Sequence, residues 1–420
     1  MDRLPRTASR YGVALVAPAS VSAAHFLLQL VLIQLFVPAQ FGSVALILAV
    51  IQFGFGLSNA LVATPYTVAV NRPDSDAAAD TAGSIYFLVN ALFCIGMGLA
   101  CAAISHAFDP QPLASAAWGL AGGLTMLRWF GRAHAYAHHT PYRAAGSDLT
   151  YALTLVGGLG LSAVFGEVTY AGTGLLFALA ALAGGAALGT GFFGSHGRML
   201  AARFSAYRPV WRDQSRWMLL GVTATEATAN AHIYLIAAFL GPAALAPVAA
   251  AGLFIKPIHL AITSLTQLER PVMTRAVFSR SFDQLDRARR QMATALGLAL
   301  LATVTVTILV LVWFPQLIVR PDFPPGTVET AAALWALIAL LQVLQTPAGV
   351  LLQGASRFRA LSMINVRSSL VSLTAATALL LVAGAVPSLF GIVLGLGFSA
   401  LWIKRAADKW QRDAEAAGAP

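Results

Sequence analysis

Twelve long apolar stretches limit what this chain can fold into. Each can cross roughly 30 Å of hydrocarbon, the last being the shortest. They cover residues 11–35, 43–69, 83–107, 114–136, 147–166, 169–193, 217–240, 243–267, 291–315, 330–352, 362–384 and 387–403. Of the 420 residues, 58% are hydrophobic and only 10% are charged, against roughly a quarter charged in soluble domains. The sequence therefore predicts an all-α polytopic membrane protein with twelve transmembrane helices.

The lysines and arginines predict its orientation. If the N-terminus lies in the cytoplasm, basic residues collect in the inner loops, and the outer loops hold only Arg320. This matches the positive-inside rule. We therefore expect a multi-pass protein of the bacterial inner membrane with both termini in the cytoplasm. The loops account for the net charge of +10, so no nucleic-acid partner is expected.

An internal repeat predicts two lobes of six helices each. Short matches recur in the same order at a spacing of about 206 residues. They are Ser9-Arg10-Tyr11 with Ser215-Arg216-Trp217, Val37-Pro38-Ala39 with Gly241-Pro242-Ala243, Pro65 with Pro271, and Tyr142-Arg143-Ala144 with Phe358-Arg359-Ala360. An even number of helices gives both halves the same orientation. We expect lobes at 1–205 and 206–420, related by a parallel pseudo-repeat around a central cavity.

Several motifs resemble the multidrug/oligosaccharidyl-lipid/polysaccharide exporter superfamily, and within it the Wzx-type polysaccharide (O-antigen) flippases. The residues that carry the resemblance are Ser9-Arg10-Tyr11, Phe36-Val37-Pro38-Ala39-Gln40-Phe41-Gly42, Ala45-Leu46 and Gln353-Gly354-Ala355-Ser356-Arg357-Phe358-Arg359. The resemblance implies a flippase that moves a polyprenyl-pyrophosphate-linked oligosaccharide from the inner to the outer leaflet, for lipopolysaccharide or exopolysaccharide biosynthesis. Its implied partners are this lipid-linked substrate, membrane lipids, and a polysaccharide polymerase and glycosyltransferases of the same pathway.

Lys256 is the strongest candidate for a substrate contact. At 1.5 Å per residue it lies about 16–20 Å from either surface, where an ionisable group is costly and is a functional candidate by default. His259 follows three residues later on the same helix face. Lys256 can hold a substrate phosphate, or it can form a structural ion pair with Glu226 of the preceding helix. For Glu226, whose face also carries Asn230, we favour this pairing over a role as a cation site.

Other polar groups inside the apolar stretches complete the predicted substrate-binding set. They are Gln52, Asn59, His25, Gln29 and Arg128. His25 has packing as its alternative role. Arg128 lies about two turns from the inner end of its helix, and snorkelling to the cytoplasm is the alternative for it.

The competing functions predict different sequence features. A multidrug or cation antiporter of the same superfamily should favour acidic groups, and a major-facilitator transporter should show a Gly- and Arg-rich turn that the loop 71–76 lacks. A membrane enzyme would need paired carboxylates or a long outer loop. The only carboxylate cluster is Asp74, Asp76 and Asp80 in a loop, and no metal-ligand spacing is present. We therefore expect no enzyme, no cofactor and no metal.

Overall fold

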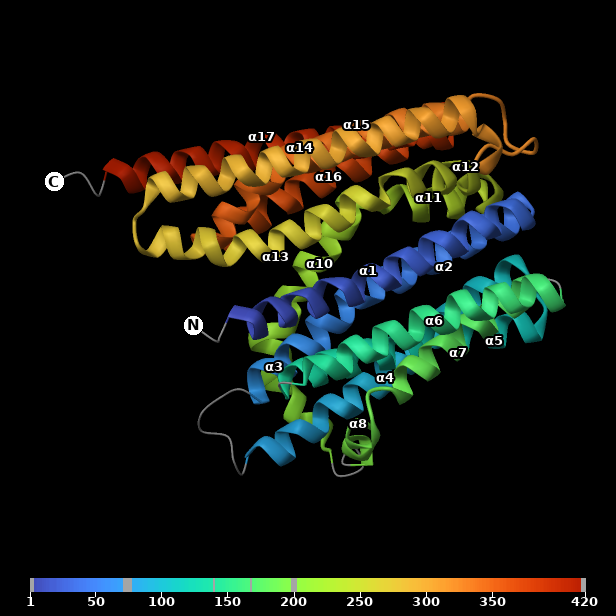
Figure 1. Cartoon of the computed structure of the whole chain (residues 1–420), viewed down its shortest axis with the longest axis horizontal. Coiled ribbons are helices and arrows are strands. Elements are labelled where there is room, and N and C mark those ends of the chain that lie inside the picture. Colours follow the sequence, from blue (N-terminus) through green and yellow to red (C-terminus); the bar gives the residue numbers. More distant parts are fainter. Residues whose placement is uncertain (1–3, 71–77, 139, 167, 198–201, 417–420) are drawn as a thin grey trace. The chain divides into compact units, whose positions relative to one another are not determined.

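The computed structural model describes residues 4–70, 78–138, 140–166, 168–197 and 202–416. The described residues form helices and no strands (Figure 1). The chain divides into two compact units, Met1–Val222 and Thr223–Pro420, whereas the sequence suggested a boundary at 205/206. The boundary between the units lies inside one helix, Arg216–Ala229. The carboxylate loop at 71–77 lies outside the described residues, as does the side chain of Asp80.

Unit 1 is built from long helices and ends in a linker of short ones. The long helices enclose an apolar interior that includes Trp118, Phe130 and Tyr151. Its elements are α1 (Leu4–Leu35), α2 (Pro38–Ser58), η1 (Asn59–Ala63), α3 (Thr64–Val70), α4 (Ala78–Phe108), α5 (Pro112–Ala137), α6 (Pro141–Phe165), α7 (Tyr170–Ala186), α8 (Thr190–His196), η3 (Phe204–Tyr207), α9 (Arg208–Val210) and η4 (Trp211–Ser215). The helix α10 (Arg216–Ala229) then crosses into unit 2.

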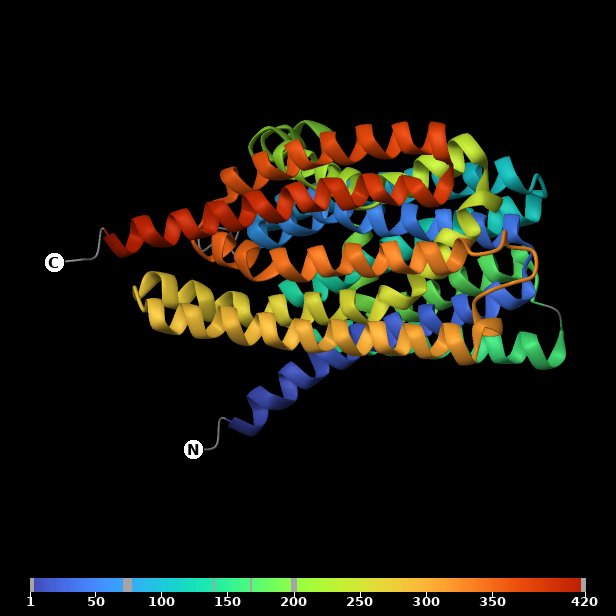
Figure 2. The same cartoon turned by 90° about the horizontal axis from the view of Figure 1, so that it is seen from above.

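The described part of unit 2 is also built from helices. Its remaining elements are α11 (Ala231–Leu240), α12 (Pro242–Gly252), η5 (Leu253–Ile255), α13 (Lys256–Phe278), α14 (Phe282–Trp313), η6 (Pro315–Leu317), α15 (Thr327–Gly354), α16 (Phe358–Ala383) and α17 (Ala385–Ala416). Figures 1 and 2 both show α13 and α14 as a long hairpin. The helix α11 ends in a turn at Gly241, which has a φ of 80°, a conformation that glycine adopts without steric cost.

Small residues let neighbouring helices approach closely in unit 2. A Cβ placed on Gly395 of α17 would lie 2.5 Å from the Cβ of Ser372 of α16, and 3.1 Å from the carbonyl oxygen of Ser368. Ser368 also donates a hydrogen bond of 2.7 Å to the carbonyl oxygen of Gly395. Because lipid is as apolar as the helices themselves, such close packing and interhelical hydrogen bonding stabilise helix pairs in membranes.

The described helices support a multi-pass membrane protein. Each of the twelve predicted stretches falls on helix. By length and hydropathy alone, eight helices of the described part can cross a membrane, or nine if α7 and α8, which are bent by 99°, form one span. The helix α5 is not among them, and it carries Arg128, Arg132 and His134; α10 and α11 are short because the helix is interrupted at Asn230. The count of twelve and the pseudo-repeat therefore stay predictions.

Besides the bend between α7 and α8, three helices are interrupted within predicted spans. The helix that begins as α2 passes through a π-helical turn, η1, before it continues as α3. Asn230 separates α10 from α11, and the 3₁₀ turn η5 separates α12 from α13. Such interruptions leave backbone groups without their usual partners and are common at functional sites. Three predicted site residues, Asn59, Asn230 and Lys256, lie at or directly beside these breaks.

Candidate functional site

A buried ion pair lies at the centre of unit 1. Arg128 of α5 donates from Nη1 to Oδ1 of Asp148 on α6 at 2.7 Å, and the two side chains are only 3% and 1% exposed. Arg132, one turn further along α5, places its Nε 3.0 Å from the same oxygen. Two guanidinium groups therefore share one carboxylate. We call Arg128, Arg132 and Asp148 the arginine–aspartate cluster.

Aromatic rings cover both arginines. The guanidinium carbon of Arg128 lies 4.1 Å from the ring centre of Tyr151, and that of Arg132 lies 4.7 Å from the ring of Trp129. A planar guanidinium stacks well on an aromatic face, and the attraction grows when both groups are removed from water. The rings thus stabilise the positive charge that one carboxylate leaves uncompensated.

Hydrogen bonds extend the cluster to the first two helices. The Tyr151 hydroxyl lies 2.7 Å from Nε2 of His25 on α1, and Gln29 donates to the His25 carbonyl oxygen at 3.1 Å. On the other side, the Trp129 indole donates to Asn59 Oδ1 at 3.0 Å. Four predicted site residues, His25, Gln29, Asn59 and Arg128, therefore belong to one network in unit 1.

Glycine at position 184 makes this arrangement possible. A Cβ on Gly184 of α7 would lie 2.8 Å from Cδ of Arg128, 2.8 Å from the Ser147 carbonyl oxygen and 3.1 Å from Cβ of Tyr151. Atoms do not approach a real Cβ so closely, so only glycine lets α7 pack here against α5 and α6.

The structure corrects the alternative considered for Arg128. Its side chain does not snorkel to the surface, because it is buried on Asp148. Asp148 was not among the site residues predicted from the sequence. The signal was available, since Asp148 is the only acidic residue in the apolar stretch 147–166, and a charge there needs a partner.

In unit 2, Lys256 lies at the start of α13, directly after the 3₁₀ turn η5. Its side chain is exposed. Lys256 forms no ion pair with any carboxylate of the described residues. A lysine in mid-span without a counter-charge is available to an anionic ligand.

Glu226 is engaged elsewhere, so the expected pairing with Lys256 is wrong. The Tyr234 hydroxyl donates to Glu226 Oε1 at 2.6 Å, and Asn230 Nδ2 donates to Oε2 at 3.1 Å. Both partners lie beyond Glu226 on the same chain segment, across the interruption at Asn230. The carboxylate therefore bridges α10 and α11 of the interrupted helix.

The remaining predicted residues differ in their surroundings. His259 of α13 lies 2.8 Å, through Nε2, from Oε1 of Gln342 on α15, so its ring is held in place. Gln52 of α2 is exposed and makes no hydrogen bond within the described part of the chain. The structure thus groups His25, Gln29, Asn59 and Arg128 in unit 1, and Glu226 with Asn230 in unit 2. Lys256, His259 and Gln52 stand outside these two groups.

His232 in α11 was also not among the residues predicted from the sequence. This residue is fully buried, and neither ring nitrogen has a hydrogen-bond partner among the residues described. Its ring lies edge-on to Trp335, 5.2 Å between centres, and Trp335 donates to the Val248 carbonyl oxygen at 3.0 Å. In the described residues, no group of three or more His, Cys, Asp or Glu side chains could hold a metal ion.

Neither a family model nor a curated protein matches the sequence. Solved structures do match. An inward-facing multidrug resistance MATE family transporter of the MOP superfamily is 14% identical; the match covers 98% of this chain and 96% of that one, with a TM-score of 0.68. The Lipid II flippase MurJ, in an inward closed conformation, is 8% identical over 94% of this chain and 87% of that one, with a TM-score of 0.71.

A third match is also a transporter of this superfamily. It is a MOP superfamily transporter from Pyrococcus furiosus, described as having a binding pocket of reverse polarity; it is 11% identical over 97% of this chain and 94% of that one, with a TM-score of 0.54. At these identities the matches establish the fold and not the substrate. The chain is a multi-pass membrane protein with the fold of the transporters of the MOP superfamily.

Proposed function

We propose that this protein is a flippase that moves an anionic, lipid-linked oligosaccharide from the inner to the outer leaflet by alternating access. The observation that carries the proposal is the positive charge left uncompensated within the predicted spans. Lys256 has no carboxylate partner in the described residues, and two arginines share Asp148. A charged head group that leaves water needs such cations to replace part of its hydration.

The second candidate, an antiporter for organic cations, fits these charges less well. A cation site needs a carboxylate that is free to bind. Asp148 already faces two arginines, and Glu226 accepts two hydrogen bonds from its own helix segment. The match to a multidrug transporter is the reason to consider the antiporter, and the match to the Lipid II flippase favours a lipid-linked substrate.

The test is transport in proteoliposomes by Lys256 variants. Lys256→Gln should lower the flipping of a fluorescent polyprenyl-pyrophosphate-linked oligosaccharide by about tenfold or more, because a hydrogen bond to a charged group is lost. Lys256→Arg should retain part of the rate, since it keeps the charge. Lys409→Gln, in the exposed last part of α17, is the matched control and should transport normally.

A double variant separates the proposed role from a structural one. Because Glu226 is held by Asn230 and Tyr234, adding Glu226→Gln to Lys256→Gln should not restore transport. Full transport by the double variant would refute the anion-binding role of Lys256. Efflux of organic cations by the wild-type protein, without flipping of the oligosaccharide lipid, would favour the antiporter.

A further inference from the structure

A cavity of about 350 Å³ lies in unit 1, and no member of the arginine–aspartate cluster is among its lining residues. It lies on the side that the positive-inside rule assigns to the cytoplasm. Its lining comes from α3, α4, the end of α5, the start of α6, and α8. Neither the predicted site residues nor the proposed transport mechanism uses it.

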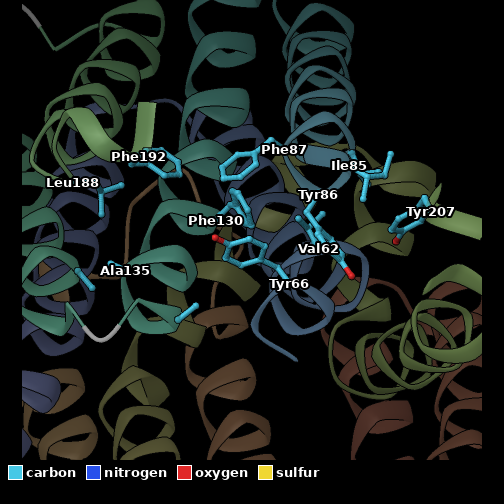
Figure 3. Close-up of a cluster of buried hydrophobic side chains, with 13 residues drawn as sticks. Val62, Tyr66, Ile85, Tyr86, Phe87, Phe130, Ala135, Leu188, Phe192 and Tyr207 are labelled. Carbon is cyan, nitrogen blue, oxygen red and sulfur yellow. The ribbon is translucent and has the colours of Figure 1, made fainter. Parts of the chain in front are cut away.

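Tyr66, Phe87 and Phe192 form the aromatic wall of this cavity. They pack against Phe130, and Figure 3 shows the four rings grouped together. Tyr66 and Phe87 each lie 5.4 Å from Phe130, measured between ring centres, and Phe192 lies 6.3 Å from it. The wall therefore offers an apolar surface to one side of a ligand.

The polar lining is basic. His134 and His138 stand one helical turn apart with ring centres 4.4 Å apart, and Tyr66 places its hydroxyl 2.9 Å from Nε2 of His138. Arg143 adds a guanidinium whose Nη1 reaches the Leu188 carbonyl oxygen only at 3.4 Å. Among the described residues that line the cavity, none is an aspartate or a glutamate.

Two basic side chains of this cavity have donors to spare. Within the described residues Arg143 has no ion pair, and the ring of His134 makes no hydrogen bond. Nε2 of the neighbouring His196 is buried and has no partner among them either. An arginine with free N–H groups beside a histidine is suited to a phosphate group, because the guanidinium fork matches the phosphate oxygens and a ring N–H adds a third donor.

We propose that this cavity binds a phosphate group from the cytoplasmic side, either the phosphate of an anionic lipid head group or free phosphate. Arg143 and His134 hold the anion, and the aromatic wall lies against the uncharged part of the ligand. A volume of about 350 Å³ is near the lower end for small-molecule sites, so it suits a small head group and not an oligosaccharide. The inference is independent of the proposed transport function, because it uses none of the same residues.

The test measures binding to the purified full-length protein. One arm uses nanodiscs of phosphatidylcholine with and without phosphatidylglycerol, and counts bound lipid by native mass spectrometry. The other arm adds inorganic phosphate to protein in phosphatidylcholine nanodiscs and follows the thermal unfolding temperature. If only phosphatidylglycerol is retained, the ligand is an anionic lipid. If inorganic phosphate raises the thermal unfolding temperature, the ligand is the free anion, and either result supports the site. The proposal is overturned if the protein retains no phosphatidylglycerol and phosphate leaves the unfolding temperature unchanged.

Two variants and one control locate the site. Arg143→Gln should weaken binding by about tenfold, since it removes a charge-assisted hydrogen bond. Gly191→Leu keeps every charge but fills the cavity with its side chain. The backbone can accept this change, because a Cβ at Gly191 meets only Arg143 Nη1, at 3.9 Å. Gly191→Leu should abolish binding, and it tests the site even if Arg143→Gln fails to fold. Arg359→Gln, at the matching place in the sequence repeat, is the control and should bind normally. An equal loss in Arg143→Gln and Arg359→Gln would refute the proposal.

Discussion

Asp148 is the residue on which the charges of unit 1 depend. Two arginines approach its Oδ1, at 2.7 and 3.0 Å, and the pair with Arg128 is almost completely buried. Removing one partner of a buried ion pair destabilises a protein more than replacing the whole pair by apolar residues, because an unpaired charge remains in apolar surroundings. The stability of unit 1 should therefore respond to Asp148 more than to any single arginine.

Replacing Asp148 by asparagine should strongly destabilise unit 1. The change keeps the size of the side chain but leaves two guanidinium groups without a counter-charge, for which buried pairs in soluble proteins give a cost of about 3–5 kcal/mol. We expect a lower thermal unfolding temperature in detergent and less protein in the membrane. Asp283→Asn, an exposed position in the first turn of α14, is the control and should be neutral. An unchanged unfolding temperature for Asp148→Asn would contradict the ion-pair assignment.

The two arginines should differ in their tolerance of glutamine. Arg132→Gln removes the cation whose side chain is 14% exposed and leaves the buried Arg128–Asp148 pair neutral and complete. Arg128→Gln removes the buried hydrogen bond and the contact with Tyr151. We expect Arg132→Gln to unfold near the wild-type temperature and Arg128→Gln well below it, measured side by side. The opposite order would show that Arg132 is the principal partner.

The sequence predicted individual polar residues better than their partners. Arg128, His25 and Asn59 were identified because a polar group in an apolar stretch is conspicuous. Asp148 was overlooked, although the same reasoning applied to it. Pairing depends on how helices rotate against one another, and periodicity along one helix does not fix that rotation. This is why Lys256 was matched to Glu226 by depth alone, whereas Glu226 bonds within its own segment.

At the scale of the helices, interruptions and close approaches shape the site. The π-helical turn η1 lies beside the linker, and Tyr207 of the linker donates to the Leu61 carbonyl oxygen at 2.6 Å. The same hydroxyl lies 2.9 Å from Ser215 Oγ. The sequence predicted one continuous span over 43–69, because a π turn has no reliable signal in residue type.

Tyr207→Phe should loosen the linker from η1. The variant loses a hydroxyl that bonds to a carbonyl oxygen of the π turn, at a cost of about 1 kcal/mol. We expect faster amide hydrogen exchange in residues 203–215 and little change elsewhere. Tyr136→Phe, whose ring is 42% exposed, serves as the control. Equal exchange in both variants would show that the linker is not held by this hydroxyl.

Gly184→Ala should separate α7 from α5. The added Cβ would meet Arg128, the Ser147 backbone and Tyr151 within 3.1 Å, so a helix must shift. Gly160→Ala in α6 has nothing within 4 Å of the added Cβ and should be neutral or stabilising by up to about 1 kcal/mol, as expected for alanine in a helix. Thermal unfolding of the two variants should therefore move in different directions. A neutral Gly184→Ala would show that α7 is not tightly packed there.

For the whole molecule, the number of spans decides where the ends lie. An even number places both termini on one side, and an odd number places them on opposite sides. Hydropathy of the described helices supports eight or nine spans. The helix α5 carries charges, α10–α11 is interrupted, the apolar part of α1 that was searched is short, and the bent pair α7–α8 makes the difference between eight and nine. The charge pattern of the loops supports twelve. The sequence thus predicted the class of fold, while the span count requires topology to be measured.

Reporter fusions should place both termini in the cytoplasm. A fluorescent protein or a phosphatase after Pro420 should report a cytoplasmic location, because Lys404, Arg405, Lys409 and Arg412 precede it. A fusion in the loop 316–329, where Arg320 is the only basic residue, should report the outer side. A C-terminus outside the cytoplasm would refute the twelve-span topology.

The shared carboxylate of the arginine–aspartate cluster also has a consequence for how the protein can evolve. Because Asp148 serves two cations, its loss in one step leaves both arginines without a counter-charge, whereas Arg132 can be lost first. Relatives that lack Asp148 should therefore lack Arg128 as well, with apolar residues at both positions. Positions 128 and 148 should vary together between species, and Arg132 should vary more freely.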